Sequence, residues 1–135
     1  MSEINPPVVV CEGNDLTAFK RLEDVESHIE AYDVASHEFF DSRGQRLLAT
    51  ADGYRVELHP DPEATPEPER LETLIRSYFS RLGTRRPRFA DYASAADHAA
   101  SLHELLDLRL KLSDEQRYGF WSGVRQRLIG HKSSD

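Results

Sequence analysis

Cysteine is nearly absent from this sequence, in which Cys11 is the single one among 135 residues. One thiol cannot form an intrachain disulfide, and it cannot supply a cysteine-based zinc site. No apolar run approaches the roughly 18–20 residues that a membrane-spanning helix requires. Residues 1–7 have neither the basic start nor the apolar stretch of a secretory signal. These absences predict a cytoplasmic protein that does not enter a membrane.

Lysine is scarce as well, with 3 Lys against 14 Arg, and alanine is abundant, which together indicate a bacterial gene of high GC content. Hydrophobic residues make up 39% of the chain and charged residues 30%, the proportions of a folded protein rather than a disordered one. A chain of 135 residues can bury a core by itself, so we predict one domain spanning residues 1–135.

Charge is unevenly distributed along the chain. Residues 1–69 hold 5 Lys/Arg and 16 Asp/Glu, a balance of −11, whereas residues 70–135 hold 12 and 8, a balance of +4. One interpretation is that the two halves attract each other or differ by chance. The other is that the acidic half presents a surface to a basic partner, because summed charge steers association.

The first half of the chain predicts a β-rich region over residues 8–58. Residues 8–11 and 16–20 read as a hairpin, and three further strands are expected over residues 38–41, 45–50 and 54–58. In the strand over residues 54–58, apolar and charged residues alternate, which is typical of a sheet with one packed face. Between the hairpin and the third strand, apolar residues from Leu22 to Tyr32 at helical spacing predict one covering helix that ends near Asp33.

Four prolines break the pattern in residues 59–68, which we interpret as an extended acidic connector. A helical half is expected over residues 69–130, followed by a polar tail at 131–135. Its first helix is predicted to begin with Thr65 as N-cap and to end at Gly83. Ser94 is predicted to cap the next helix, and the capping box at residues 113–116 to open the last. The fold class is therefore α+β, an antiparallel sheet with one packed helix followed by about three C-terminal helices.

The sequence contains no nucleophile elbow, phosphate-binding glycine loop or dinucleotide fingerprint. His103 and Asp107 are one helical turn apart, but a zinc-protease motif needs His at both ends of that span, so a surface pair is expected. The same five-residue pattern recurs from His37 to Asp41, in a predicted strand. Residues four apart in a strand lie ~13 Å apart, which is too far for one metal ion. Cys11, in a Val-rich strand, is expected to be buried and inert. We predict no catalytic residue, no metal site and no cofactor.

Arg85, Arg86 and Arg88 lie near Phe89 and Tyr92, a combination that can grip phosphates and stack bases. The chain has a net charge of −7, whereas a nucleic-acid-binding domain usually has a broad basic face. A local salt bridge to the acidic half, or a solvated loop, is the favoured interpretation.

Residues 8–48 resemble small uncharacterised bacterial proteins, some of which are similar to immunity proteins of bacterial toxin systems. The resemblance rests on the Val-Cys-Glu-Gly-Asn-Asp-Leu stretch, the helix stripe from Leu22 and the Asp-Ser-Arg-Gly turn. It implies the order hairpin, helix, strands, and it carries over no catalytic residue.

Our leading hypothesis is a non-enzymatic protein-binding module, most specifically an immunity protein whose acidic surface covers the active site of a basic toxin. The expected contributors are six acidic residues, Glu23, Asp24, Glu26, Glu30, Asp33 and Asp41. One alternative is a small enzyme or ligand-binding domain with a pocket between sheet and helices, marked by convergent His37, His59 or His103. Another is a homo-oligomer in which the C-terminal helices pair.

Overall fold

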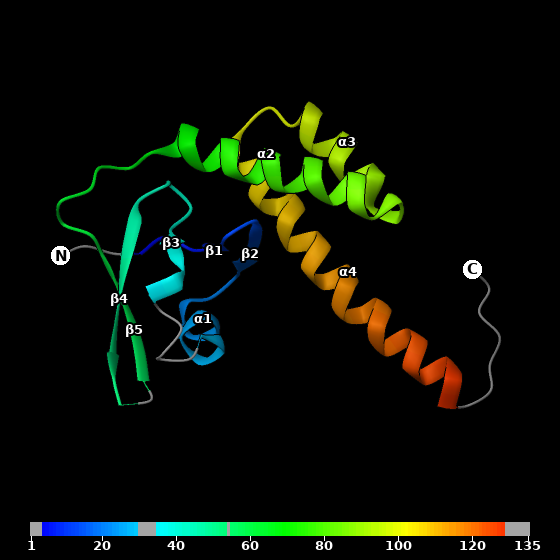
Figure 1. Ribbon diagram of the computed structural model, residues 1–135, viewed down its shortest axis with the longest axis horizontal. Coiled ribbons are helices and arrows are strands. Elements are labelled where there is room, and N and C mark those ends of the chain that lie inside the picture. The colour runs from blue at the N-terminus through cyan, green and yellow to red at the C-terminus, as the bar shows by residue number, and fades with distance from the viewer. Residues whose placement is uncertain (1–3, 30–34, 54, 129–135) are drawn as a thin grey trace.

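The computed structural model describes residues 4–29, 35–53 and 55–128, and for Asp52 and residues 117–128 it describes the backbone alone. Five strands form one antiparallel sheet in the order β2-β1-β3-β4-β5 (Figure 1). Their bounds are β1 Val8–Glu12, β2 Asp15–Phe19, β3 Glu38–Phe40, β4 Arg46–Asp52 and β5 Arg55–Pro60. The predicted α+β fold, with an antiparallel sheet first and helices after it, is confirmed.

Helices cover the sheet on both faces. The bounds are α1 Leu22–His28, α2 Pro68–Arg85, the 3-10 helix η2 Pro87–Phe89, α3 Ala90–His98 and α4 Leu102–Leu128. The short α1 contacts β5 and β2 from one side, while α2 and α4 contact β2 from the other. In Figure 1, α4 starts near α2 and α3 and its C-terminal part runs away from the sheet.

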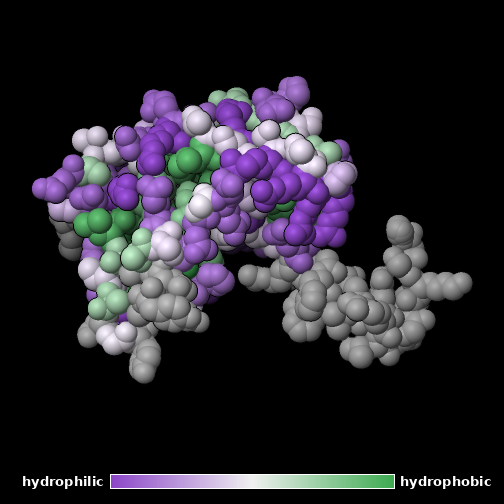
Figure 2. All heavy atoms as spheres, viewed as in Figure 1, coloured by the Kyte–Doolittle hydropathy of each residue, from purple (hydrophilic) through white to green (hydrophobic). Residues whose placement is uncertain are grey.

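Alternation along the strands separates two cores. Val8, Val10 and Phe39 face α1 and pack with Val25 and Ile29. Their neighbours Val9, Cys11 and Phe40 face the other way and join the larger core, which holds residues of α2, α3 and α4. In β5, Val56 and Leu58 are buried while Arg55 and Glu57 are exposed, as the alternation predicts. On the face shown in Figure 2, hydrophobic side chains form only small separate patches among hydrophilic ones.

The predicted start of α2 at Thr65 is wrong, because the helix begins at Pro68 with Glu67 as its N-cap. A tertiary contact sets this position: the Glu67 N–H donates to the Gly44 carbonyl at 2.9 Å. Gly44 has a φ of 81°, and a Cβ built there would lie 2.6 Å from the Glu67 carbonyl carbon. The chain therefore passes too close to Gly44 for any other residue at that position.

The predicted end of the same helix at Gly83 is also wrong, since α2 continues to Arg85. Gly83 lies inside the helix, where a Cβ would approach the Ala93 Cβ to 2.7 Å. Gly83 therefore allows α2 and α3 to come close, and it does not terminate the helix.

The predicted boundaries of the last helices differ from the structure. Ser94 lies within α3, which ends at His98. Ser101 begins the next helix instead: its Oγ accepts from the Glu104 N–H at 3.2 Å, and the Glu104 carboxylate accepts from the Ala100 N–H at 2.9 Å. This arrangement resembles a capping box. The predicted helix start at residues 113–116 is wrong, because α4 runs through it without a break.

The helix that begins at Leu22 is shorter than predicted. It ends at His28, and Ile29 has extended backbone angles. The predicted end at Asp33 and the predicted tail at residues 131–135 lie outside the described residues.

Candidate functional site

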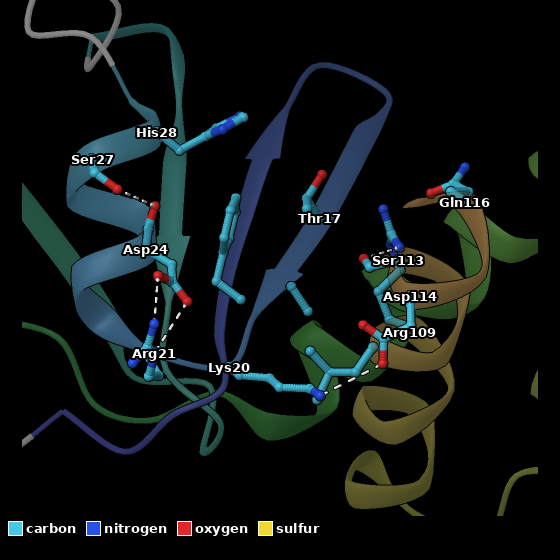
Figure 3. A pocket seen from close by; sticks show the side chains of 13 residues that line it. Thr17, Lys20, Arg21, Asp24, Ser27, His28, Arg109, Ser113, Asp114 and Gln116 are labelled. Carbon is cyan, nitrogen blue, oxygen red and sulfur yellow. Dashed lines mark hydrogen bonds and ion pairs between the residues drawn. The ribbon is translucent and has the colours of Figure 1, made fainter. Parts of the chain in front are cut away.

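A groove of about 740 Å³ lies between α1 and α4, with β2 at its base (Figure 3). Arg21, Asp24 and His28 line it from the α1 side, and Ser113 and Gln116 line it from α4. The groove therefore joins the two helical layers across one edge of the sheet. Its walls come from segments about 90 residues apart, and side chains of both charges line it.

Arg109 lies at the base of the groove and is 4% exposed. Its Nε donates to the Leu16 carbonyl of β2 at 2.9 Å, and its Nη1 donates to the Ser113 hydroxyl at 2.8 Å. The guanidinium carbon lies 5.0 Å from the centre of the Tyr78 ring, a cation–π contact. Burial lowers the pKa of Arg109 from its ordinary value. The side chain thus fixes α4 to the outer edge of β2.

The opposite edge of the sheet is capped in a similar way. The Glu26 carboxylate on α1 accepts from the Leu58 N–H of β5 at 3.0 Å. Unpaired backbone groups on an edge strand invite pairing with another strand. Because a charged side chain occupies each edge, addition of a further strand at Leu16 or Leu58 would first have to displace it.

Exposed ion pairs form the rim of the groove. Lys20 Nζ lies 3.5 Å from Asp114 Oδ2, and Arg21 Nη2 lies 3.4 Å from Asp24 Oδ1. Figure 3 shows the first pair joining the end of β2 to α4. Exposed pairs of this kind contribute little to stability. Their charges can therefore exchange partners at small cost when another molecule approaches.

Five of the six predicted acidic residues fall into three groups. Glu23 is exposed on α1, and Asp24 lines the groove. Glu26 is half-buried and holds β5. Glu30 and Asp33 lie outside the described residues.

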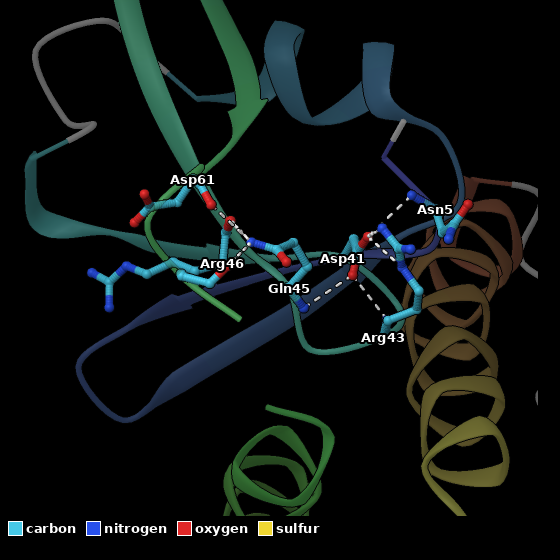
Figure 4. A network of polar contacts seen from close by, with 7 residues as sticks. Asn5, Asp41, Arg43, Gln45, Arg46 and Asp61 are labelled. Carbon is cyan, nitrogen blue, oxygen red and sulfur yellow. Dashed lines mark hydrogen bonds and ion pairs between the residues drawn. The ribbon is translucent and has the colours of Figure 1, made fainter. Parts of the chain in front are cut away.

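Asp41, the sixth predicted contributor, cannot reach a partner because it is 0% exposed (Figure 4). Its carboxylate accepts from the N–H groups of Asn5, Arg43 and Gln45 at 3.3, 2.9 and 3.1 Å. The Arg43 guanidinium donates to it at 3.0 Å. The inclusion of Asp41 in a docking surface is therefore corrected: this side chain holds the turn before β4 and the segment before β1.

A second pocket of about 450 Å³ lies at the tip of the β1–β2 hairpin. Glu12 and Asp15 line its hairpin side, and Arg81, Arg85 and Arg86 line its α2 side. The Arg81 Nη2 donates to the Asn14 carbonyl at 2.9 Å. Of the two interpretations of this arginine segment, the salt bridge to the acidic half is absent among the described side chains, where neither Arg85 nor Arg86 has a carboxylate oxygen within 4.0 Å. Arg85, Arg86 and Arg88 are exposed, which agrees with the solvated alternative.

The aromatic side chains of that segment are engaged in packing. Phe89 is 4% exposed, and its ring lies 4.5 Å from the Arg88 guanidinium carbon. Tyr92 stacks with Phe79 at a centroid distance of 6.3 Å. Phe89 is thus too buried for a nucleic-acid base to stack on it, and one face of the Tyr92 ring is occupied by Phe79.

The histidines make separate contacts. His103 lies 3.3 Å from Asp107 on the exposed surface of α4, which confirms the predicted pair. His37 lies 3.7 Å from Glu12, and its Nδ1 lies 3.2 Å from the Ser36 hydroxyl, which itself donates to Glu12. His59 lies beside Glu57 and Thr50 on β5 and β4. These three histidines therefore contact three different carboxylates, whereas His28 packs against the Phe19 ring and His98 lies 2.9 Å from the Ser94 carbonyl. Within the described ranges, no group of three or more His, Cys, Asp or Glu residues could hold a metal ion.

Cys11 is buried, as predicted. Burial, reinforced by the charge of Glu38, raises the pKa of its thiol to about 11. Since the thiolate is the reactive form, Cys11 is a poor nucleophile near neutral pH.

The sequence did not predict the contacts of two arginines, Arg109 and Arg81. Arg109 was expected only as one position of a helix, although a charged residue among Leu102, Leu105 and Leu106 is a signal of a buried polar contact. Arg81 carries no local signal, because its role depends on the hairpin tip, 67 residues earlier in the chain.

Comparison of the chain with protein-family models, with curated proteins and with solved structures finds no match. Among the helices of the described residues, none is both long enough and apolar enough to cross a membrane.

Proposed function

We propose that this protein is a non-enzymatic binding module that recognises another protein through α1 and the groove between α1 and α4. The observation that supports this proposal is the groove itself, an open hollow of about 740 Å³ with charged side chains of both signs. Charged side chains on both walls of a groove can pair with opposite charges of a partner surface, which steers and orients association. The exposed pairs Lys20–Asp114 and Arg21–Asp24 place such charges at its rim.

The chemistry of the surrounding side chains favours binding over catalysis. The Cys11 thiol is buried with a raised pKa, and His37, His59 and His103 are dispersed over the segment before β3, β5 and α4. His28, which lines the groove, packs against the Phe19 ring at a centroid distance of 5.2 Å. A general base or a nucleophile needs a neighbouring group within hydrogen-bond reach of a substrate atom. The groove offers hydrogen bonds and charge, which are sufficient for recognition.

The most specific version of the proposal is a toxin-neutralising immunity protein, as the resemblance of residues 8–48 implies. The net charge of −7 favours association with a basic partner, because opposite net charges accelerate encounter. Among the described acids of the predicted set, Glu23 and Asp24 have side chains exposed enough for this contact. Neutralisation would follow from occlusion of the partner's active site.

The test is binding to the product of a toxin-like gene adjacent to this one, measured by calorimetry together with toxin activity. We expect the Glu23→Lys/Asp24→Lys variant to bind at least about tenfold more weakly, since close charge pairs at interfaces couple by 1.5 kcal/mol or more. Asp97→Lys/Asp107→Lys, which makes the same charge change on α3 and α4, is the matched control. Equal loss in both variants, or no binding by the wild-type protein, would contradict the proposal.

A further inference from the structure

The arginines that line the pocket at the hairpin tip differ from five others in the described chain. Arg21, Arg43 and Arg46 each have a carboxylate oxygen within 3.4 Å. Arg70 and Arg76 likewise lie within 3.4 Å of a carboxylate oxygen. In the described part of the chain, Arg85 and Arg86 have no such partner within 4.0 Å, although both line the pocket. This pocket thus holds guanidinium groups that form no ion pair with a described carboxylate.

Three features show that the pocket is organised. Arg81 is held by the Asn14 carbonyl at 2.9 Å, so its guanidinium position is fixed by the hairpin. Arg85 follows it by one helical turn on the same side of α2, and Gln116 of α4 adds an amide to the lining. A single basic residue in the last turn of a helix is explained by the helix dipole. The dipole does not explain the convergence of three arginines on one hollow that also includes α4.

The opposite wall of the pocket has a different chemistry. Glu12 and Asp15 are exposed residues of the hairpin whose carboxylates accept hydrogen bonds rather than donate them. Glu12 already accepts from the Ser36 hydroxyl and Asp15 from the Leu16 N–H, so a ligand would use their remaining acceptor positions. A ligand that fits both walls needs an anionic end for the arginines and hydroxyl or amino donors for the carboxylates. The volume of about 450 Å³ lies within the range of small-molecule sites, about 300–1,000 Å³.

We infer that this pocket binds a small phosphate monoester, with the phosphate on Arg81, Arg85 and Arg86 and the hydroxyl-bearing body toward Glu12 and Asp15. Guanidinium groups bind phosphate oxygens through paired, charge-assisted hydrogen bonds. The two carboxylates disfavour a nucleic-acid backbone, whose successive phosphates would pass close to them. This inference does not depend on the proposed protein-binding function, which uses the groove and α1.

The test is isothermal titration calorimetry of the full chain with ribose 5-phosphate, adenosine 5′-monophosphate and inorganic phosphate, with ribose as the uncharged comparison. We expect saturable binding of all three phosphates and none of ribose, with the two esters tighter than inorganic phosphate. Arg85→Gln/Arg86→Gln should weaken the binding of each phosphate by at least about tenfold, because charge-assisted hydrogen bonds are lost. The side chains replaced are exposed, so circular dichroism should show an unchanged fold.

Arg88→Gln is the matched control, because Arg88 lies in the same segment but contacts Phe89 and does not line the pocket. It should change the affinity by less than about twofold. Glu12→Gln should reduce the advantage of the esters over inorganic phosphate, since Glu12 is on the wall that faces the ligand body.

Three results would overturn the inference. The first is the absence of saturable binding for all three phosphates. The second is an equal loss in Arg88→Gln, which would indicate general surface charge. The third is competition by a single-stranded oligoribonucleotide without terminal phosphates, which would assign the arginines to nucleic acid.

Discussion

Asp41 in the sheet half and Arg109 in the helical half are both buried, at 0% and 4% exposure, but their surroundings differ. Asp41 accepts from three backbone N–H groups and from the Arg43 guanidinium, so its charge is met by an opposite charge. Arg109 donates to a carbonyl and a hydroxyl and lies over the Tyr78 ring. Its described contacts are neutral groups.

This difference shows how each half uses a buried charge. The Asp41 network organises the backbone of two neighbouring segments, the turn before β4 and the segment before β1, which lose their hydrogen-bond acceptor if the carboxylate is removed. Arg109 makes one bond to the sheet edge and otherwise packs as a long, flat side chain. We therefore expect the fold to depend more on Asp41 than on Arg109.

The largest effect should come from Asp41→Ala. It leaves three N–H groups without their acceptor, each at a cost of about 1–3 kcal/mol and together roughly 3–5 kcal/mol, whereas the half-exposed Arg43 side chain returns to water. The free energy of unfolding from urea denaturation should fall by that amount. Asp24→Ala, which removes an exposed carboxylate paired with Arg21, should cost less than about 1 kcal/mol. Similar losses in the two variants would show that the Asp41 network is not a major source of stability.

Gly83→Ala should have the next largest effect, in the helical half. An exposed Gly→Ala change within a helix stabilises by about 1 kcal/mol. Here the added methyl group would lie 2.7 Å from the Ala93 Cβ, and overpacking costs about 1–3 kcal/mol. We expect a net loss in urea denaturation, partly recovered in Gly83→Ala/Ala93→Gly. A more stable single variant would mean that α2 and α3 separate without cost.

Gly83 also illustrates what could be predicted from the sequence. The turns between the strands predicted over residues 8–11 and 16–20, and over 45–50 and 54–58, follow from a local signal, because Gly13 and Gly53 have the positive φ that tight turns require. Alternation in β5 likewise follows from the sequence, since each side chain has only two faces available. These signals are contained in a few consecutive residues.

The helix boundaries depend on contacts that are distant in sequence. A glycine that ends a helix and one that allows close packing look the same in the sequence, and only the position of Ala93 distinguishes them. The start of α2 at Pro68 depends on the carbonyl of Gly44. The same limit applies to the candidate sites, because the groove and the arginine pocket are formed by segments that the fold brings together.

A smaller effect is expected for Arg109→Met, which tests the other side of the comparison. Methionine fills similar space and removes the desolvation cost of the buried charge, while the Leu16 carbonyl loses its donor. These terms oppose each other, so the free energy of unfolding should change by no more than about 1–2 kcal/mol. Arg109→Lys, which keeps the charge but loses the planar fork, should be no more stable than Arg109→Met. A loss as large as that of Asp41→Ala would contradict the expected difference between the halves.

The smallest effect concerns Cys11, whose thiol faces the larger core between sheet and helices and is buried as a neutral group. Burial raises its pKa from the ordinary value of 9.0 to about 11, so the unfolded chain loses this proton at lower pH than the folded chain. The contribution of the neutral thiol to the free energy of unfolding is fully present below pH 9 and is lost as the pH rises toward 11.

Urea denaturation of the wild-type protein and of Cys11→Ala at pH 8 and pH 10 isolates this contribution. Tyr78 and Tyr92, whose pKa values are also raised, are common to both proteins. The wild-type protein should lose about 1 kcal/mol more than the variant over this interval. A parallel decline in the two proteins would mean that the thiol ionises as easily in the fold as outside it, and that the layer between the halves does not exclude charge.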